Sequence, residues 1–197
     1  MPRCALALAA LLLAVTFAAT TTTARENRPA PTTTTTAASS DRVARGEYLA
    51  RVGLCHDCHT PHVPGPKGPE PDMTRALSGH PSDIVIAEPP AMKGPWVFAG
   101  AGTFTAWGGP WGVSFTANLT PDKETGLGNW TEEMFFRALR TGRHEGNGRP
   151  ILPPMPYQYI GSMTDEDLRS LFAYLQSIPA VRNRVPKPID PPEEEGR

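Results

Sequence analysis

The stretch "CHDCH" at residues 55–59 decides how this chain is organised. It holds two of the three cysteines of the 197-residue sequence, and the third, Cys4, lies near the very start of the chain. A disulfide between Cys55 and Cys58 would close a loop too small to stabilise a fold. Two cysteines at this spacing therefore indicate a chemical role.

The spacing Cys-x-x-Cys-His is the attachment signal of a c-type haem, in which two thiols bond the haem vinyl groups and the next imidazole binds iron. Cys55 and Cys58, one helical turn apart, are predicted to form the thioether links, and His59 is predicted to be the proximal ligand. Because the motif occurs once, one covalent haem c is expected. The other histidines are expected at the surface and not as ligands: His56, His62, His80 and His144.

Three other interpretations of the motif are open. A thioredoxin-type redox pair would require a surrounding βαβ pattern, which this sequence lacks. A zinc site could take its four ligands from the motif and His62, although these crowd into one short segment instead of two separated pairs. A purely structural role does not explain why an exported chain has no other cysteine to pair with.

The first 24 residues read as a secretory signal peptide, with a positive charge at Arg3, an apolar run from Ala5 to Ala19 and small residues after it. This run is shorter than the roughly 20 residues that span a bilayer. Residues 25–40 are rich in Thr, Ala and Pro and predict a disordered spacer. The mature protein is therefore expected in the bacterial periplasm, with membrane contact only if the N-terminal segment is retained.

Apolar residues three and four apart indicate three helices. Each begins at a polar residue that can cap its first turn, and the last two end at Gly and Pro. The first starts at Ser40 or Asp41 and leads to Cys55, the second lies within 129–142 with Thr131 as its cap, and the third lies within 163–179 with Thr164 as its cap.

The segment 60–128 separates the first two helices and is rich in Pro, Gly and aromatic residues. Within it, aromatic residues alternate with small ones, which suits a short hairpin or an ordered loop. Two uses of this insert are open. It could dock to a partner, or its tryptophans Trp96, Trp107 and Trp111 could cover the haem edge.

A haem electron carrier usually takes its second axial ligand from far along the chain, and Met opposite His raises the reduction potential. Met155 stands between Pro154 and Pro156, in a segment that cannot be the interior of a helix. A stiff loop of this kind holds a thioether at one distance from iron, so Met155 is predicted to be the distal ligand. Met163 fits a hydrophobic staple with Leu168, which explains it without iron.

Together these residues resemble a class I c-type cytochrome, and more closely the cytochrome c domains and subunits of bacterial periplasmic alcohol, aldehyde and gluconate dehydrogenase complexes. The resemblance rests on "RGEYLARVGLCHDCHTP", "ANLTPDKETGLGNWTEEMFFRALRTGRHEGNG" and "LPPMPYQYIGSMTDEDLRSLFAYLQSIPAVRNRVP". It implies an all-α cytochrome c fold over residues 41–186, with three main helices around one haem, a long Pro/Gly/aromatic-rich insert and an extended tail at 187–197. It also implies that the first and third helices cross near Gly46 and Tyr174, and that Met155 is the distal ligand.

A protein of this kind transfers electrons and is not an enzyme, although it can be the electron-transfer subunit of a dehydrogenase complex. The partners that the resemblance implies are redox proteins: a dehydrogenase, an oxidase or another cytochrome. The formal net charge of −1 and the lack of a Lys/Arg run argue against a nucleic-acid partner. The alternatives from other classes are a haem enzyme or gas sensor, which would need an open sixth position, and a zinc-dependent module.

Overall fold

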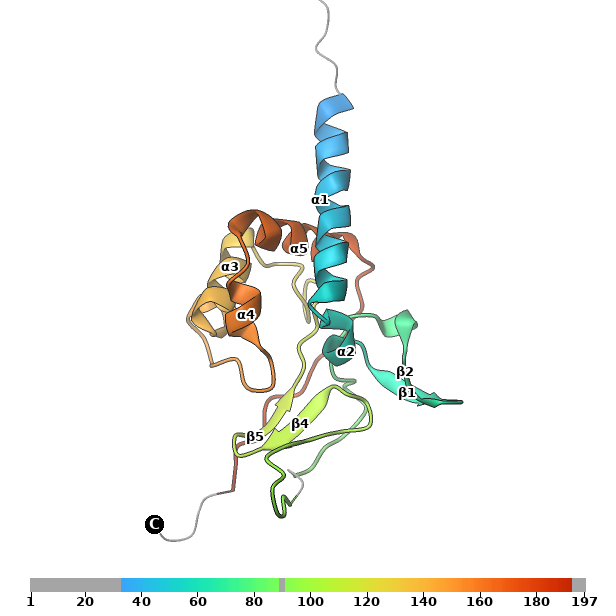
Figure 1. Cartoon of the computed structure of the whole chain (residues 1–197), viewed down its shortest axis with the longest axis vertical. Coiled ribbons are helices and arrows are strands. Elements are labelled where there is room, and N and C mark those ends of the chain that lie inside the picture. The colour runs from blue at the N-terminus through green and yellow to red at the C-terminus, as the bar shows by residue number, and fades with distance from the viewer. Residues whose placement is uncertain (1–32, 89–90, 193–197) are drawn as a thin grey trace, which may run out of the picture. The chain divides into compact units, whose positions relative to one another are not determined.

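Three long helices organise the computed structural model, which describes residues 33–88 and 91–192 (Figure 1). They correspond to the three helices expected from the sequence and are α1 (Thr33–Val52), α3 (Glu132–Thr141) and α5 (Asp165–Ser177). The shorter helical elements are α2 (Cys55–His59) and α4 (Tyr157–Gly161), with 3-10 turns η1 (Met73–Arg75) and η2 (His144–Gly146).

The ends of α3 and α5 follow from local sequence. The Thr131 hydroxyl accepts a hydrogen bond from the Met134 amide at 3.2 Å, and the Thr164 hydroxyl accepts one from the Asp167 amide at 3.1 Å. Gly142 ends α3 with a φ of 67°, in the left-handed region that favours glycine. Both predicted N-caps and the predicted glycine stop are confirmed.

Helix α1 begins at Thr33, so the cap expected at Ser40 or Asp41 is wrong. The helix extends into the predicted spacer, 25–40, because each residue added to an existing helix gains a hydrogen bond without a new nucleation step. The rest of that spacer and the predicted signal peptide, 1–24, lie outside the described residues. Within the described part of the chain, no helix combines the length and apolar character needed to cross a bilayer.

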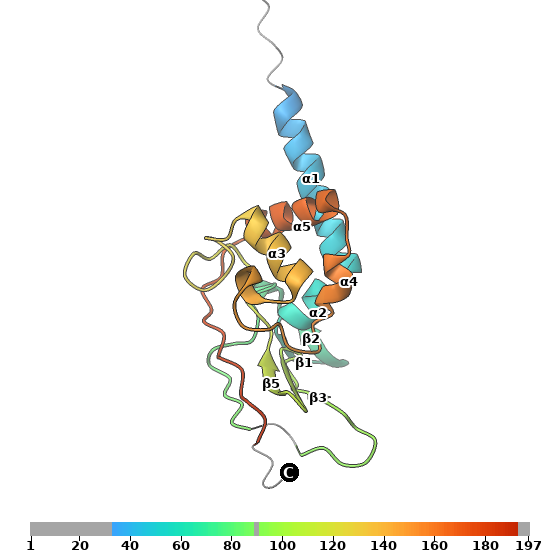
Figure 2. The ribbon, with the colours of Figure 1, turned by 90° about the vertical axis from the view of Figure 1, so that its left-hand side faces the viewer.

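Helices α1 and α5 pack against each other (Figures 1 and 2). The contacts of Gly46 place the crossing near Gly46 and Tyr174, as expected. A Cβ placed on Gly46 would lie 1.9 Å from the Ser170 carbonyl oxygen and 2.7 Å from Tyr174 Cβ. Only glycine lets the two backbones approach this closely. Beside the crossing, the Arg45 guanidinium lies 2.9 Å from a carboxylate oxygen of Asp167 and lowers the pKa of that carboxyl.

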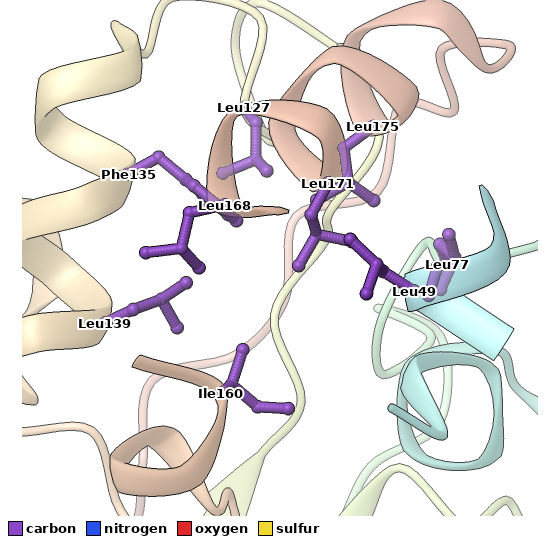
Figure 3. Packing of buried hydrophobic residues seen from close by; sticks show 10 residues of the cluster. Leu49, Leu77, Leu127, Phe135, Leu139, Ile160, Leu168, Leu171 and Leu175 are labelled. Carbon is purple, nitrogen blue, oxygen red and sulfur yellow. The ribbon is translucent and has the colours of Figure 1, made fainter. Parts of the chain in front are cut away.

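The main apolar cluster lies between these helices, and Figure 3 shows side chains from α1, α3, α4 and α5 directed toward one another. Its members come from distant parts of the chain, so its formation brings the helices together by burying apolar surface. The buried members are Leu49, Ala50, Leu77, Leu127, Phe135, Leu139, Ile160, Leu168, Leu171 and Leu175.

Strands form within the segment 60–128, so the all-α class expected for the cytochrome c fold of this chain is wrong. One antiparallel pair joins β1 (His62–Gly65) to β2 (Gly68–Pro71). A three-stranded antiparallel sheet has the order β3 (Ala99–Gly100), β4 (Ala106–Gly109) and β5 (Gly112–Phe115). In Figure 1 the strands β4 and β5 lie below the helices.

The β4–β5 hairpin forms because its sequence alternates small and large residues around a tight turn. Gly112 has a φ of 86° and lies so close to the C-terminal segment that a Cβ there would be 1.9 Å from the Ile189 carbonyl oxygen. Val113 and Ile189 exchange two backbone hydrogen bonds of 2.8 and 3.0 Å. The described part of the predicted tail is therefore held against β5. A second apolar cluster lies here, built from Ala106, Val113 and Phe115 with Ile86, Ala101, Val185 and Ile189 packed against it.

Candidate haem site

Helix α2 places the two thiols and the imidazole of the motif within little more than one helical turn. Residues three and four positions apart in a helix share one face, so Cys55, Cys58 and His59 are neighbours in space as well as in sequence. Both cysteines are free, with no disulfide between them. The helix starts directly after Leu54, whose φ of 55° turns the chain away from α1. This arrangement suits a ligand bonded at two points and ligated at a third.

His59 is held in the tautomer that a metal ligand requires. The residue is 7 % exposed, and Nδ1 lies 2.8 Å from the carbonyl oxygen of Ala117. A carbonyl can only accept, so Nδ1 carries the hydrogen and Nε2 keeps its lone pair. Burial lowers the pKa of His59, which favours the neutral ring. The neutral imidazole with a free Nε2 is the form that binds iron.

The two cysteines are thiols and not thiolates. Burial raises the pKa of Cys55 to about 11 and also raises the pKa of Cys58. A reactive redox pair depends on a lowered thiol pKa. The thioredoxin-type interpretation is therefore disfavoured.

The zinc interpretation also loses support. Within residues 33–88 and 91–192, no group of three or more His, Cys, Asp or Glu side chains is arranged to hold a metal ion. His62, the extra ligand that this interpretation needs, has Nδ1 3.1 Å from the Thr60 carbonyl oxygen and its ring 4.8 Å from that of Phe104. It belongs to β1 rather than to the face formed by Cys55, Cys58 and His59.

The two residues inside the motif face a different part of the surface. His56 and Asp57 line a groove of about 530 Å³ together with Arg51, Met73 and Tyr174. His56 also has Nδ1 3.0 Å from the Thr60 hydroxyl. The motif thus has two sides, and the predicted haem residues do not line this groove.

Met155 lies in the loop that leads into α4 and packs against the main apolar cluster. Its carbonyl accepts a 2.9 Å hydrogen bond from the Tyr157 amide, close to the start of α4. Met163 packs against the same cluster, and its amide donates to the Ile160 carbonyl at 3.2 Å. Because both methionines contact this cluster, the choice of Met155 as distal ligand stays a prediction.

Cys55 and Met155, which are far apart in sequence, contact the same apolar cluster. A Cβ on Gly53 would lie 3.6 Å from Ile160 Cδ1 and 3.8 Å from Cys55 Sγ, so the region around α4 meets the start of α2 at Gly53. Figure 3 shows Leu49 and Ile160 directed into the space between the helices. A thiol that could bond a haem vinyl group and a thioether that could bind iron lie on one apolar cluster, which fits a haem because its macrocycle is mostly apolar.

One unpaired polar atom also fits a haem. The indole nitrogen of Trp107 is buried and has no hydrogen-bond partner among the described residues. Trp107 pairs with Ser114 across the β4–β5 hairpin, and the Ser114 hydroxyl bonds to Pro153 in the loop of Met155. A buried N–H normally has an acceptor. A carboxylate group of a haem is an acceptor of the kind that this N–H lacks.

No family model matches the chain. It is 31% identical over 147 residues to the cytochrome c subunit of a quinone alcohol dehydrogenase from Gluconobacter oxydans, which covers 73% of this chain and 23% of that protein. It is 33% identical over 132 residues to the gluconate 2-dehydrogenase cytochrome c subunit of Pantoea cypripedii, covering 67% and 22%. The cytochrome subunit of fructose dehydrogenase from Gluconobacter japonicus is 31% identical over 150 residues, covering 76% and 22%. The chain resembles these cytochrome c subunits.

This cytochrome c resemblance confirms the one predicted from the three sequence blocks. The chain spans less than a quarter of the length of the curated relatives named above. The likeness therefore covers only part of each relative. The activities of the whole relatives are properties of those proteins.

Sequence reasoning missed two sets of residues in this cytochrome-like chain. The Ala117 carbonyl that orients His59 has no side-chain signal, because every residue carries a carbonyl. His80 was expected at the surface and is fully buried, with Nδ1 2.9 Å from the Thr105 hydroxyl and Nε2 2.9 Å from the Ile84 carbonyl oxygen. Asn183 was also unforeseen, and its side-chain amide donates to two carbonyls near His80.

Proposed function

We propose that this chain is a monohaem c-type cytochrome that transfers single electrons between periplasmic redox partners, with His59 and Met155 as the iron ligands. The observation that carries the proposal is the face of α2, where two thiols lie beside an imidazole whose Nδ1 is occupied by the Ala117 carbonyl. The likeness to cytochrome c subunits supports the same chemistry.

Each residue has a separate task in this proposal. The thiols of Cys55 and Cys58 hold one haem c covalently, and Nε2 of His59 binds the iron. The hydrogen bond from Nδ1 to Ala117 fixes the ring and makes Nε2 a better donor. A bound haem supplies the iron, whose one-electron redox change carries the electron.

The surroundings of these residues favour the reduced state. Met155 would supply a neutral thioether as the second ligand of a haem iron bound by His59, and such a ligand pair raises the reduction potential. The apolar side chains around Cys55 and Met155 lower the local dielectric, which disfavours the extra positive charge of oxidised iron. Ligand type and burial therefore act in the same direction.

The proposed partners are redox proteins: a dehydrogenase first, because the relatives are subunits of dehydrogenases, or an oxidase or another cytochrome. The chain is then an electron carrier and not an enzyme, and it fits the role of electron-transfer subunit in a dehydrogenase complex. Its location in the bacterial periplasm rests on the predicted signal peptide, 1–24. Membrane attachment would require that the N-terminal segment is kept.

The test is the full chain produced in a host that has cytochrome maturation machinery. We expect an intact mass of the polypeptide plus one haem, haem staining after denaturing electrophoresis, and a reduced form that does not bind carbon monoxide. A mass that fits bound zinc would contradict the proposal. Rapid carbon monoxide binding by the unmutated reduced protein would instead favour a haem enzyme or gas sensor with an open sixth position.

A further inference from the structure

The loop that carries Met155 has few hydrogen bonds of its own. Four of residues 150–156 are prolines, which have no amide hydrogen. On the side of α3, the Ile151 amide donates to the Gly142 carbonyl at 2.8 Å. On the side of the sheet, the Ser114 hydroxyl donates to the Pro153 carbonyl at 2.5 Å. Among the residues that the structure describes, no other side chain hydrogen-bonds to residues 151–156.

Ser114 is presented by a well-supported strand. It is 7 % exposed, and its neighbours Val113 and Phe115 are buried in the second apolar cluster. Strand β5 is paired on one edge with β4 and on the other with Ile189. The position of the hydroxyl is therefore set by the sheet, because neither edge of β5 is free to move independently.

The geometry points to Ser114 as a positioning residue for Met155, an inference that rests on the proposed haem function. Pro153 lies two residues before Met155, and the φ angles of Pro154 and Pro156 are fixed by their rings. A displacement of the Pro153 carbonyl is therefore transmitted through Pro154 to the backbone of Met155, from which the thioether side chain extends. The insert 60–128 gains a role by this contact, since it braces the loop of the distal ligand.

The experiment compares haem-loaded, full-length variants at Ser114. Ser114→Ala removes the hydroxyl, and Ser114→Thr and Ser114→Val form a pair of nearly equal shape in which only Thr keeps the hydroxyl. Loss of one hydrogen bond of ordinary net strength should raise the fraction of protein with Met155 away from iron by roughly fivefold. We expect Ala and Val to weaken the sulfur-to-iron absorption band, lower the potential and speed carbon monoxide binding, while Thr stays close to the unmutated protein.

A matched control separates positioning from general stability. Ser170 is 2 % exposed, and its hydroxyl donates to the Glu166 carbonyl at 2.8 Å within α5, away from the loop of Met155. Ser170→Ala should lower the unfolding midpoint without changing the band or carbon monoxide binding.

Two failures can be told apart. If Met155→Ala leaves the band intact, the ligand assignment in the proposed function is wrong. If Met155→Ala abolishes the band but Ser114→Ala and Ser114→Val retain it and stay closed to carbon monoxide, the inference about Ser114 alone is wrong. Should Ser114→Ala not accumulate, the Thr and Val pair decides, because any cost of the added methyl group is shared by both.

Discussion

The proposed haem residues and the groups that hold them in place come from different regions of the molecule. Cys55, Cys58 and His59 lie on α2, and Met155 leads into α4, so the ligands belong to the helical region. Two groups of the segment 60–128, which contains the strands, bond to this region: the Ala117 carbonyl accepts from His59, and the Ser114 hydroxyl donates to Pro153 in the loop of Met155.

These two contacts make the strand-containing insert part of the proposed haem site. A haem protein tunes its iron through groups that orient the ligands as much as through the ligands themselves. In this chain the proposed orienting groups are the hydroxyl of Ser114, within β5, and the carbonyl of Ala117, two residues after that strand. Substitutions in the helical region should therefore remove function, whereas those in the strand region should shift it.

The largest effect expected on the helical side is loss of the cofactor. Replacing both Cys55 and Cys58 with Ser should abolish covalent haem attachment, because no other thiol lies in the motif. Haem staining of a denaturing gel and an intact mass measure this directly, and Cys4→Ser is the matched control that should keep the haem. Covalent haem in the double variant would contradict the assignment of Cys55 and Cys58 as the residues that bond the haem.

The next effect concerns the distal ligand. Met155→Ala should lose the sulfur-to-iron band, lower the potential and let the reduced protein bind carbon monoxide, since a thioether is removed from the iron. Met163→Ala should mainly cost stability, because Met163 packs beside the start of α5. Spectra and redox titration of both variants decide the matter, and the reverse pattern would move the ligand to Met163.

A pair of glycines compares the stability of the two regions. Gly46→Ala should destabilise the protein by about 3 kcal/mol, because a Cβ there forces apart two packed helices. Gly112→Ala has an equally close contact, with Ile189, but it should mainly loosen one hairpin edge and speed hydrogen exchange at the Val113 amide. Denaturant unfolding measures both, with Gly102→Ala as control because no atom lies within 4 Å of its added Cβ. Equal losses of unfolding free energy in Gly46→Ala and Gly112→Ala would contradict a difference in stability between the two regions.

The smallest effect expected is a pH dependence in the strand region. Burial lowers the pKa of His80 below its ordinary value of 6.5, so the unfolded chain binds a proton more readily than the folded protein. The stability linked to His80 is therefore present above pH 6.5 and is lost as the pH falls toward the lower folded pKa. The unfolding midpoint should fall less on acidification in His80→Gln, and parallel curves for the two proteins would contradict this.

The helical region was largely predictable because its signals are local. The caps Thr131 and Thr164 and the stop at Gly142 act on neighbouring amides and carbonyls, within one turn of the chain. By contrast, the predicted start of α1 is wrong, because a helix can extend upstream of Ser40 without a special capping residue. The crossing at Gly46 came from family resemblance, and the observed contact with Ser170 supplies its reason.

The strand region was less predictable. Alternating aromatic and small residues suit a short hairpin, yet the predicted fold class is all-α, and the strands show that this prediction is wrong. Short strands gain their stability from partners distant in sequence, such as Val113 with Ile189. The burial of His80 likewise depends on Thr105 and Phe115, which no local pattern connects to it.

The arrangement of the motif is readable from the sequence alone, because residues three and four apart share a helical face in any context. The groups that contact the motif and the loop of Met155 become visible only in the folded chain. The Ala117 carbonyl reaches His59, and the Ser114 hydroxyl reaches the carbonyl of Pro153, across long separations in the chain. A backbone carbonyl is common to every residue and leaves no mark in a sequence, so its role becomes visible only when folding brings a donor to it.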